Sequence, residues 1–291
     1  MFWKRRKVGV NVQGAGVLIL ITGLIAFVAF ALARSFGFAF TSLWVGPFFY
    51  GALLLGTLLT VPLFDRMPVD WVGLGVHRWV GREIGWGIGL GLGMATFAWV
   101  PSALLGTVEF RGIEQSSTLL YWFVFILIGA TGEELLFRGY LFQRGIEVFG
   151  VLIATLLFSA GFALAHLGNP ELSWLSLINT FIAGIFFSAC YLVTEGLWLP
   201  IAAHVAWNCM LSLVLGLPTS GLIFEESLFR TGVEDHCFLT GGSFGPEGGI
   251  GATVALLLGG AILYIIPGIR IAPWSYARSF WAIYRQRGGE H

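Results

Sequence analysis

The sequence predicts an all-α membrane protein, a bundle of about eight transmembrane helices in a single domain covering residues 1–291. Hydrophobic residues make up 57% of the chain and charged residues only 11%, and the mean hydropathy of +0.84 is far above that of soluble domains. The 41 glycines and 12 tryptophans agree with this class, because glycine is frequent in membrane helices and tryptophan at membrane interfaces. A formal net charge of zero gives no indication of a nucleic-acid partner.

Apolar runs long enough to cross a bilayer, roughly 20 residues each, recur along the chain. They fall near residues 16–33, 43–64, 84–105, 118–138, 151–167, 174–193, 197–217 and 250–269. The first run follows a basic cluster at residues 4–7 and is too long for the apolar part of a signal peptide, so we interpret it as a retained helix. The motif-bearing core is expected at residues 118–217.

The positive charges predict how the chain is oriented. Lys and Arg concentrate on the cytoplasmic side of membrane proteins. With a cytoplasmic N-terminus, that side receives 13 of the 16 Lys and Arg residues, Arg138 and Arg144 among them, and the other side only Arg34, Arg111 and Arg230. The sequence therefore predicts a multi-pass protein of the cell membrane with both termini in the cytoplasm and the lipid bilayer as its surroundings.

Three segments outside the polar motifs also carry expectations. Residues 71–82, WVGLGVHRWVGR, mix aromatic, apolar and basic side chains, which predicts a short helix lying at the interface. Residues 218–249 form the longest loop, and we expect an ordinary exposed loop rather than a lid. The third span carries the glycines Gly85, Gly87, Gly89, Gly91 and Gly93. The first, third and last of these, at four-residue spacing, predict a face on which another helix packs closely.

Two adjacent glutamates in the fourth span, Glu133 and Glu134, indicate chemistry. Charged residues inside membrane spans are costly unless they are paired or solvated. Adjacent helix positions lie about 100° apart, so the two carboxylates cannot share one face. Glu134 and Arg138 have the i,i+4 spacing of an ion pair, which leaves Glu133 to face a cavity as a general base. Alternatively, both glutamates mark the solvated end of a helix, and this pattern alone leaves the two interpretations open.

Polar residues in two further spans favour a site. Phe162 and His166 are four residues apart near the end of the fifth span, and His204 and Asn208 are four apart in the seventh. Residues at this spacing project from one face of a helix. A single histidine in an apolar helix is often a satisfied core residue. Two histidines, an asparagine and a glutamate pair in neighbouring spans together favour a polar site.

The order of these motifs resembles a known family. EELLFR at 133–138, FALAH at 162–166 and HVAWN at 204–208 are similar to the Glu-Glu-x-x-x-Arg, Phe-x-x-x-His and His-x-x-x-Asn motifs of the CPBP family. That family, also called Abi, groups the type II CAAX prenyl proteases with bacteriocin-processing and immunity relatives. All three motifs match without substitution, and the match extends over residues 133–208.

The resemblance implies an intramembrane endopeptidase that acts on a membrane-associated protein or peptide, whether lipidated or not, without a cofactor. It implies that Glu133 and His166 hold and activate the attacking water. His204 and Asn208 would then donate hydrogen bonds to the oxyanion of the tetrahedral intermediate. The implied supporting residues, which hold the helix and tune the site, are Glu134 and Arg138.

Two alternatives remain open. Glu133, His166 and His204 could form a two-histidine, one-carboxylate zinc site, although the sequence has no His-Glu-x-x-His helix. The protein could also be a transporter or a non-catalytic immunity factor, since Glu, His and Arg line proton paths as well. The lack of internal repeats and the complete set of three motifs argue against this second alternative.

The predicted span boundaries leave a conflict of depth. They put Glu133 in the cytoplasmic half of the fourth span, whereas His166 falls late in the fifth, nearer the other face. The motifs require the two side chains to meet. We therefore expect that the fourth span extends past Arg138 or that the fifth begins later.

Overall fold

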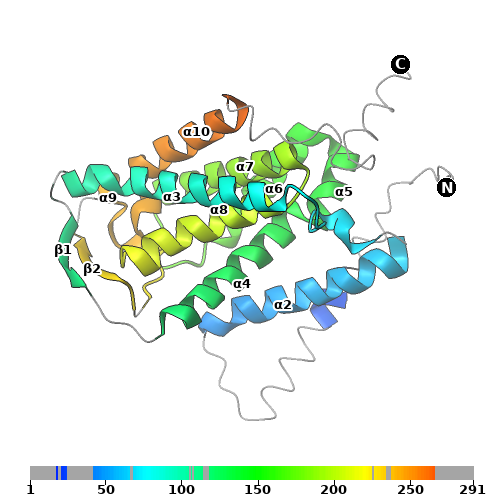
Figure 1. Ribbon diagram of the computed structural model, residues 1–291, viewed down its shortest axis with the longest axis horizontal. Helices are drawn as coiled ribbons and strands as arrows, with labels where there is room; N and C mark the ends of the chain where they lie inside the picture. Colours follow the sequence, from blue (N-terminus) through cyan, green and yellow to red (C-terminus); the bar gives the residue numbers. More distant parts are fainter. Residues whose placement is uncertain are drawn as a thin grey trace, which may run out of the picture.

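A computed structural model gives the architecture of the chain. It describes residues 18, 21–24, 42–65, 68–104, 106, 108–113, 118–224, 226–233 and 237–265. The helices are α2 (Ser42–Thr60), α3 (Val80–Leu104), α4 (Leu119–Arg138), α5 (Tyr140–Phe149), α6 (Val151–Ala165), α7 (Trp174–Thr194), α8 (Trp198–Cys209), α9 (Cys237–Thr240) and α10 (Ile250–Ile265). The strands β1 (Val108–Ile113) and β2 (Phe229–Val233) pair antiparallel at one end of the helical bundle (Figure 1). The predicted all-α membrane bundle is confirmed, with this short ribbon as an addition.

Seven of the eight predicted spans coincide with helices. Among the described residues, three helical stretches are long and apolar enough to cross a membrane: Val80–Leu104, Leu119–Phe149 and Trp174–Thr194. The other four appear as shorter apolar helices. The first predicted span lies largely outside the described residues, as do both termini, so the orientation of the chain remains a prediction.

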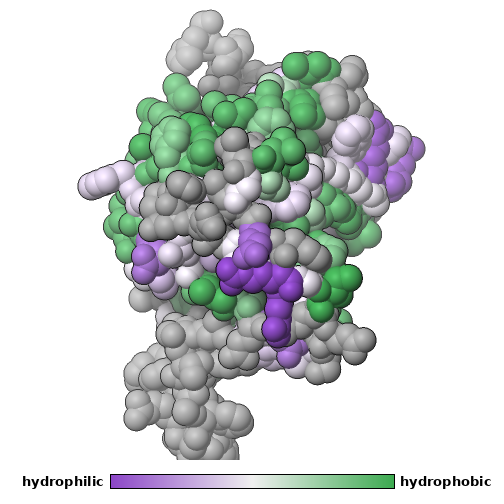
Figure 2. Space-filling model, turned by 90° about the vertical axis from the view of Figure 1, so that its left-hand side faces the viewer, coloured by the Kyte–Doolittle hydropathy of each residue, from purple (hydrophilic) through white to green (hydrophobic). Residues whose placement is uncertain are grey.

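The outer faces of the helices carry large exposed hydrophobic side chains. They include Leu54 and Leu58 on α2, Ile88 and Leu92 on α3, Leu120 and Val124 on α4, Leu152 and Leu156 on α6, and Leu257 and Leu258 on α10. Such a surface is unfavourable in water, and hydrocarbon chains solvate it. Viewed onto the end with the β-ribbon, hydrophilic residues gather between areas of hydrophobic surface (Figure 2). This face therefore has the mixed character of a membrane–water boundary.

The predicted interfacial helix over residues 71–82 is wrong. A 3₁₀ turn covers Val69–Val72, and non-helical chain follows until α3 begins. The carbonyl of Gly73 accepts a hydrogen bond from the backbone N–H of Leu197 at 2.8 Å. This long-range bond attaches the segment to the start of α8, and a tertiary attachment of this kind leaves no trace in an amphipathic pattern.

Glycines allow α3 to pack closely on α8, but they are not the predicted ones. A Cβ added at Gly87 would overlap the Cβ of Ala202, and one added at Gly91 would overlap the carbonyl oxygen of Ala203. The predicted glycines have open space around a Cβ: Gly85, Gly89 and Gly93. A shift of two positions turns a side chain by about 200° around the helix, so the predicted set points away from α8.

Gly91→Ala is therefore expected to destabilise the protein by about 1–3 kcal/mol, since the methyl group overpacks the α3–α8 contact. The matched control is Gly89→Ala, which adds the same methyl group to open space on the same helix and benefits from the higher helix propensity of alanine. Thermal unfolding in detergent micelles measures both. Equal unfolding temperatures for the two variants would contradict the assignment of the packing face.

The depth conflict disappears because the fourth helix continues. After a one-residue break α4 leads into α5, so Glu133 lies near the middle of the stretch Leu119–Phe149. The chain then reverses into α6. The ring of Phe162 on α6 packs 5.3 Å from that of Phe137 on α4. His166 follows one turn later on the returning helix and so reaches the level of Glu133.

Candidate active site

Glu134 and Arg138 form the ion pair that their spacing predicts. The Arg138 Nη1 atom lies 3.1 Å from Glu134 Oε1, and both side chains are 0% exposed. Nη2 donates to the carbonyl of Gly184 on α7 at 3.0 Å, and the guanidinium lies 4.6 Å from the centre of the Phe162 ring, a cation–π contact. The pair joins α4 to α6 and α7. The charge pattern had placed Arg138 at the cytoplasmic side, but its side chain is buried inside the protein.

His204 on α8 lies between the two glutamates. Its Nδ1 atom is 2.8 Å from Glu134 Oε1, and its Nε2 atom is 3.8 Å from Glu133 Oε2. The imidazole also stacks on Phe187, with ring centres 4.6 Å apart and planes 21° apart. Adjacent residues of one helix therefore face the two nitrogens of one imidazole, which fixes the orientation of the ring.

The two glutamates have different surroundings, as their positions on the helix predict. Glu134 is fully buried between a guanidinium and an imidazole. Glu133 is 21% exposed, and its Oε1 atom accepts a hydrogen bond from the hydroxyl of Tyr50 on α2 at 3.2 Å. Glu133 is thus the more accessible of the two carboxylates.

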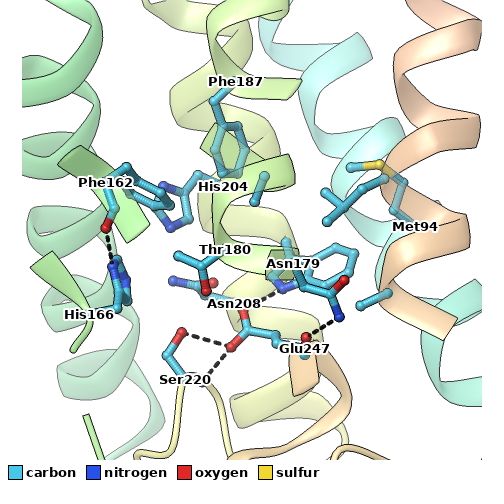
Figure 3. A pocket seen from close by; sticks show the side chains of 14 residues that line it. Met94, Phe162, His166, Asn179, Thr180, Phe187, His204, Asn208, Ser220 and Glu247 are labelled. Atoms are coloured by element: carbon cyan, nitrogen blue, oxygen red, sulfur yellow. Dashed lines mark hydrogen bonds between the residues drawn. The ribbon is translucent and has the colours of Figure 1, made fainter. Parts of the chain in front are cut away.

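A cavity of about 40 Å³ lies where His166, His204 and Asn208 meet (Figure 3). One water molecule needs about 10–15 Å³ measured in this way, so the cavity has room for a water. Glu133 is not among the residues that line it and instead lies beside His204. Two of the three motifs thus contribute to the lining of the cavity, one from the C-terminal end of α6 and one from α8.

The hydrogen bond of His166 determines its chemistry. Nδ1 lies 2.7 Å from the backbone carbonyl of Phe162. A carbonyl oxygen can only accept, so Nδ1 carries the proton, and in the neutral ring Nε2 is left as an acceptor. Asn208 lies one turn after His204 on α8, just before a π-helical turn at Met210–Val214, and such turns are frequent at functional sites. The cavity therefore has an acceptor, Nε2 of His166 at the end of α6, and an amide donor, Asn208 on α8.

One wall of the cavity comes from the segment that we expected to be an exposed loop. Residues 240–249 are largely buried, and Glu247 lines the cavity. Its Oε1 atom accepts from Trp207 Nε1 at 2.8 Å, and its Oε2 atom accepts from the Oγ of Ser220 at 2.8 Å and from the Ser220 backbone N–H. Asn179 donates to the Glu247 carbonyl at 2.8 Å. The segment is therefore attached to α7 and α8 at the site itself.

The glycine-rich run GGSFGPEGG, residues 241–249, is the feature of the sequence from which this wall could have been predicted. Gly245 has φ 98°, a conformation that favours glycine, and a Cβ there would overlap the carbonyl oxygen of Pro218. A carboxylate within such a run indicates a defined backbone path rather than a solvated loop. We missed Glu247 because its partners are distant in the sequence.

Glu247→Gln is expected to loosen this wall, because glutamine replaces one carboxylate oxygen with an NH₂ group that cannot accept, so either Trp207 or Ser220 loses its acceptor. A hydrogen bond to a charged group contributes about 1.5–3 kcal/mol. Hydrogen exchange of the amides in residues 240–249 should become at least about tenfold faster. Glu109→Gln on β1 serves as the control, since that side chain is 68% exposed. If exchange in 240–249 is the same in both variants, Glu247 does not hold the segment.

The zinc alternative finds no support in the arrangement of side chains. Among the described residues, no group of three or more His, Cys, Asp or Glu side chains is placed to hold a metal ion. His166 directs Nδ1 to a backbone carbonyl, which leaves Nε2 free to act as a ligand. Glu133, however, does not line the cavity that His166 and His204 share. We therefore derive no chemical step through a metal.

Comparison with known proteins gives one match. Residues 115–210 match the family model described as type II CAAX prenyl endopeptidase Rce1-like, and this segment contains all three motifs. No curated protein and no solved structure matches the chain. The family match and the apolar helices together support a CAAX-protease-like intramembrane endopeptidase. The match covers about a third of the chain, and within it residues 115–210 are similar to the type II CAAX prenyl endopeptidases, the relatives that the three motifs indicated.

Proposed function

We propose that this protein hydrolyses a peptide bond of a membrane-associated protein or peptide with a water that Glu133 and His166 activate, without a metal. The observation that carries the proposal is the convergence of His166, His204 and Asn208 on one water-sized cavity, with Glu133 beside His204. A base, an orienting imidazole and a pair of donors are the groups that peptide hydrolysis requires.

In the proposed reaction, the Nε2 atom of His166 accepts a hydrogen bond from the water, and Glu133 takes one of its protons. The water oxygen then forms a bond to the carbonyl carbon of the substrate, and the carbonyl oxygen becomes an oxyanion. When this intermediate collapses, the C–N bond breaks and the leaving amine takes the proton back from Glu133. The base is thereby restored, as general acid–base catalysis requires.

The oxyanion would accept hydrogen bonds from Asn208 Nδ2 and His204 Nε2. Because His204 directs Nδ1 to Glu134, its Nε2 atom donates only when both ring nitrogens are protonated. With a doubly protonated His204, the buried cluster of Glu133, Glu134, Arg138 and His204 has no net charge. Donors that are already fixed in a site with little water stabilise such an oxyanion most effectively.

A metal-free reaction predicts resistance to chelators. Turnover of a quenched farnesylated CAAX peptide by the purified protein should be the same in the presence and absence of 1,10-phenanthroline. The reason is that every group in the proposed reaction is a side chain or water. Loss of activity that zinc restores would overturn the metal-free reaction.

Comparison of cleaved peptides tests the proposed function directly. Membranes of cells that express the native chain, Glu133→Gln or the surface control Glu109→Gln would be analysed for protein termini by mass spectrometry. We expect one set of membrane-associated termini that appears with the native chain and the control and is lost with Glu133→Gln. Identical termini in all three samples would remove the support for a protease and favour a transporter or a non-catalytic immunity factor.

A further inference from the structure

One contact of Glu133 comes from outside the segment that matches the family model. Tyr50 lies on α2, which packs beside α4 (Figure 1), whereas the match begins at residue 115. The Tyr50 hydroxyl donates to Glu133 Oε1 at 3.2 Å in a partly buried position. The same carboxylate directs Oε2 towards His204, 3.8 Å away. The two oxygens of Glu133 therefore have separate partners on opposite helices.

Gly132 makes this contact possible. A Cβ at this position would overlap the Cβ and Cγ atoms of Tyr50. The backbone of Gly132 is not among the positive-φ positions of the described residues, so its conformation does not require glycine. Gly129, one turn earlier on α4, has open space around a Cβ. The missing side chain at Gly132 therefore serves the close approach of the Tyr50 ring.

We propose that Tyr50 is a positioning residue for Glu133: its hydroxyl holds Oε1, so that Oε2 faces His204, which lines the cavity. This inference rests on the proposed role of Glu133 as the base. A carboxylate on a side chain with three rotatable bonds would otherwise sample several orientations, and holding a reacting group in one orientation is a large source of rate enhancement. The groups that hold it must lie on rigid elements, and α2 and α4 are both helices.

Tyr50→Phe removes the hydroxyl and keeps the ring. We expect kcat for the farnesylated CAAX peptide to fall about tenfold with KM unchanged, because the lost hydrogen bond acts on the base and not on the substrate. Tyr264→Phe on α10 is the matched control, since it removes the same group from a side chain that is 55% exposed. Gly132→Ala should lower kcat in the same way, and Gly129→Ala should not.

A chemical probe tests the contact without any substrate. Dicyclohexylcarbodiimide is an apolar reagent that modifies carboxyl groups within membranes, and mass spectrometry locates the product. Labelling of Glu133 should be severalfold faster in Tyr50→Phe than in the native chain or in Tyr264→Phe. Equal labelling rates, or unchanged kcat in Tyr50→Phe when Glu133→Gln is inactive, would overturn the inference. A Glu133→Gln variant with native activity would instead overturn the proposed function, and the labelling rates would still decide whether Tyr50 holds the carboxylate.

Discussion

Replacing Glu133 with glutamine is expected to lower turnover by about 10²–10⁴-fold, the contribution typical of a general base. Glutamine has nearly the same shape as glutamate, so its Oε1 atom can still accept from Tyr50 and the side chain can remain beside His204. It cannot take a proton from water. Since Glu133 is partly exposed and makes no ion pair with Arg138, the stability of the fold should fall less than it does when Glu134 is replaced.

Turnover of the farnesylated peptide and thermal unfolding in micelles measure these two quantities on the same sample. Glu109→Gln makes the same chemical change on the exposed β1 strand and should leave both unchanged. An active Glu133→Gln variant would exclude Glu133 as the base. A variant that is inactive because it is unfolded would show that Glu133 supports the structure instead.

Replacing Glu134 with alanine should act mainly on the fold, whereas replacing Glu133 acts mainly on turnover. We expect a loss of about 3–5 kcal/mol of stability. This is the cost of leaving a buried charge without its partner. Arg138 would keep its bond to the carbonyl of Gly184 but lose its carboxylate, and His204 would lose the acceptor for Nδ1. Glu134→Gln should be less severe, because Arg138 and His204 both donate to Oε1 and an amide oxygen can still accept both hydrogen bonds, although it carries no charge.

Urea unfolding in micelles, followed by tryptophan fluorescence, compares the two Glu134 variants with Glu133→Gln. We expect Glu133→Gln to be the most stable of the three variants, Glu134→Gln to be less stable, and Glu134→Ala to be the least stable. If Glu134→Ala is as stable as Glu133→Gln, the pair with Arg138 does not hold α4 in place. Glu133 and Glu134 would then differ in their effect on turnover but not in their effect on stability.

The parts of the site that the sequence predicted lie within single helices. Glu134 and Arg138 pair because one helical turn separates them, and the geometry of a turn does not depend on the rest of the fold. The spacing of His204 and Asn208 likewise places both side chains at the cavity. The motifs also required that the fourth span extend past Arg138 or that the fifth begin later, and α5 provides the first of these two solutions.

The parts that could not be predicted depend on contacts between distant segments. Tyr50 and Glu247 reach the site from α2 and from the glycine-rich segment, and no local pattern indicates their partners. The prediction of the packing face of α3 was wrong, because two sets of glycines fit the helical period and only the position of α8 distinguishes them. The charge pattern likewise did not indicate that Arg144 is only 8% exposed and pairs with Glu147 at 2.8 Å.

The origin of these contacts limits how the protein can be divided. A fragment reduced to residues 115–210 would keep all three motifs, yet Glu133 would lose Tyr50, α8 would lose the glycine face of α3, and the cavity would lose the wall that carries Glu247. Its newly uncovered surfaces would be apolar and would favour aggregation over catalysis. A minimal enzyme therefore has to include the chain from α2 to α10, and a split version would regain activity only when both pieces assemble.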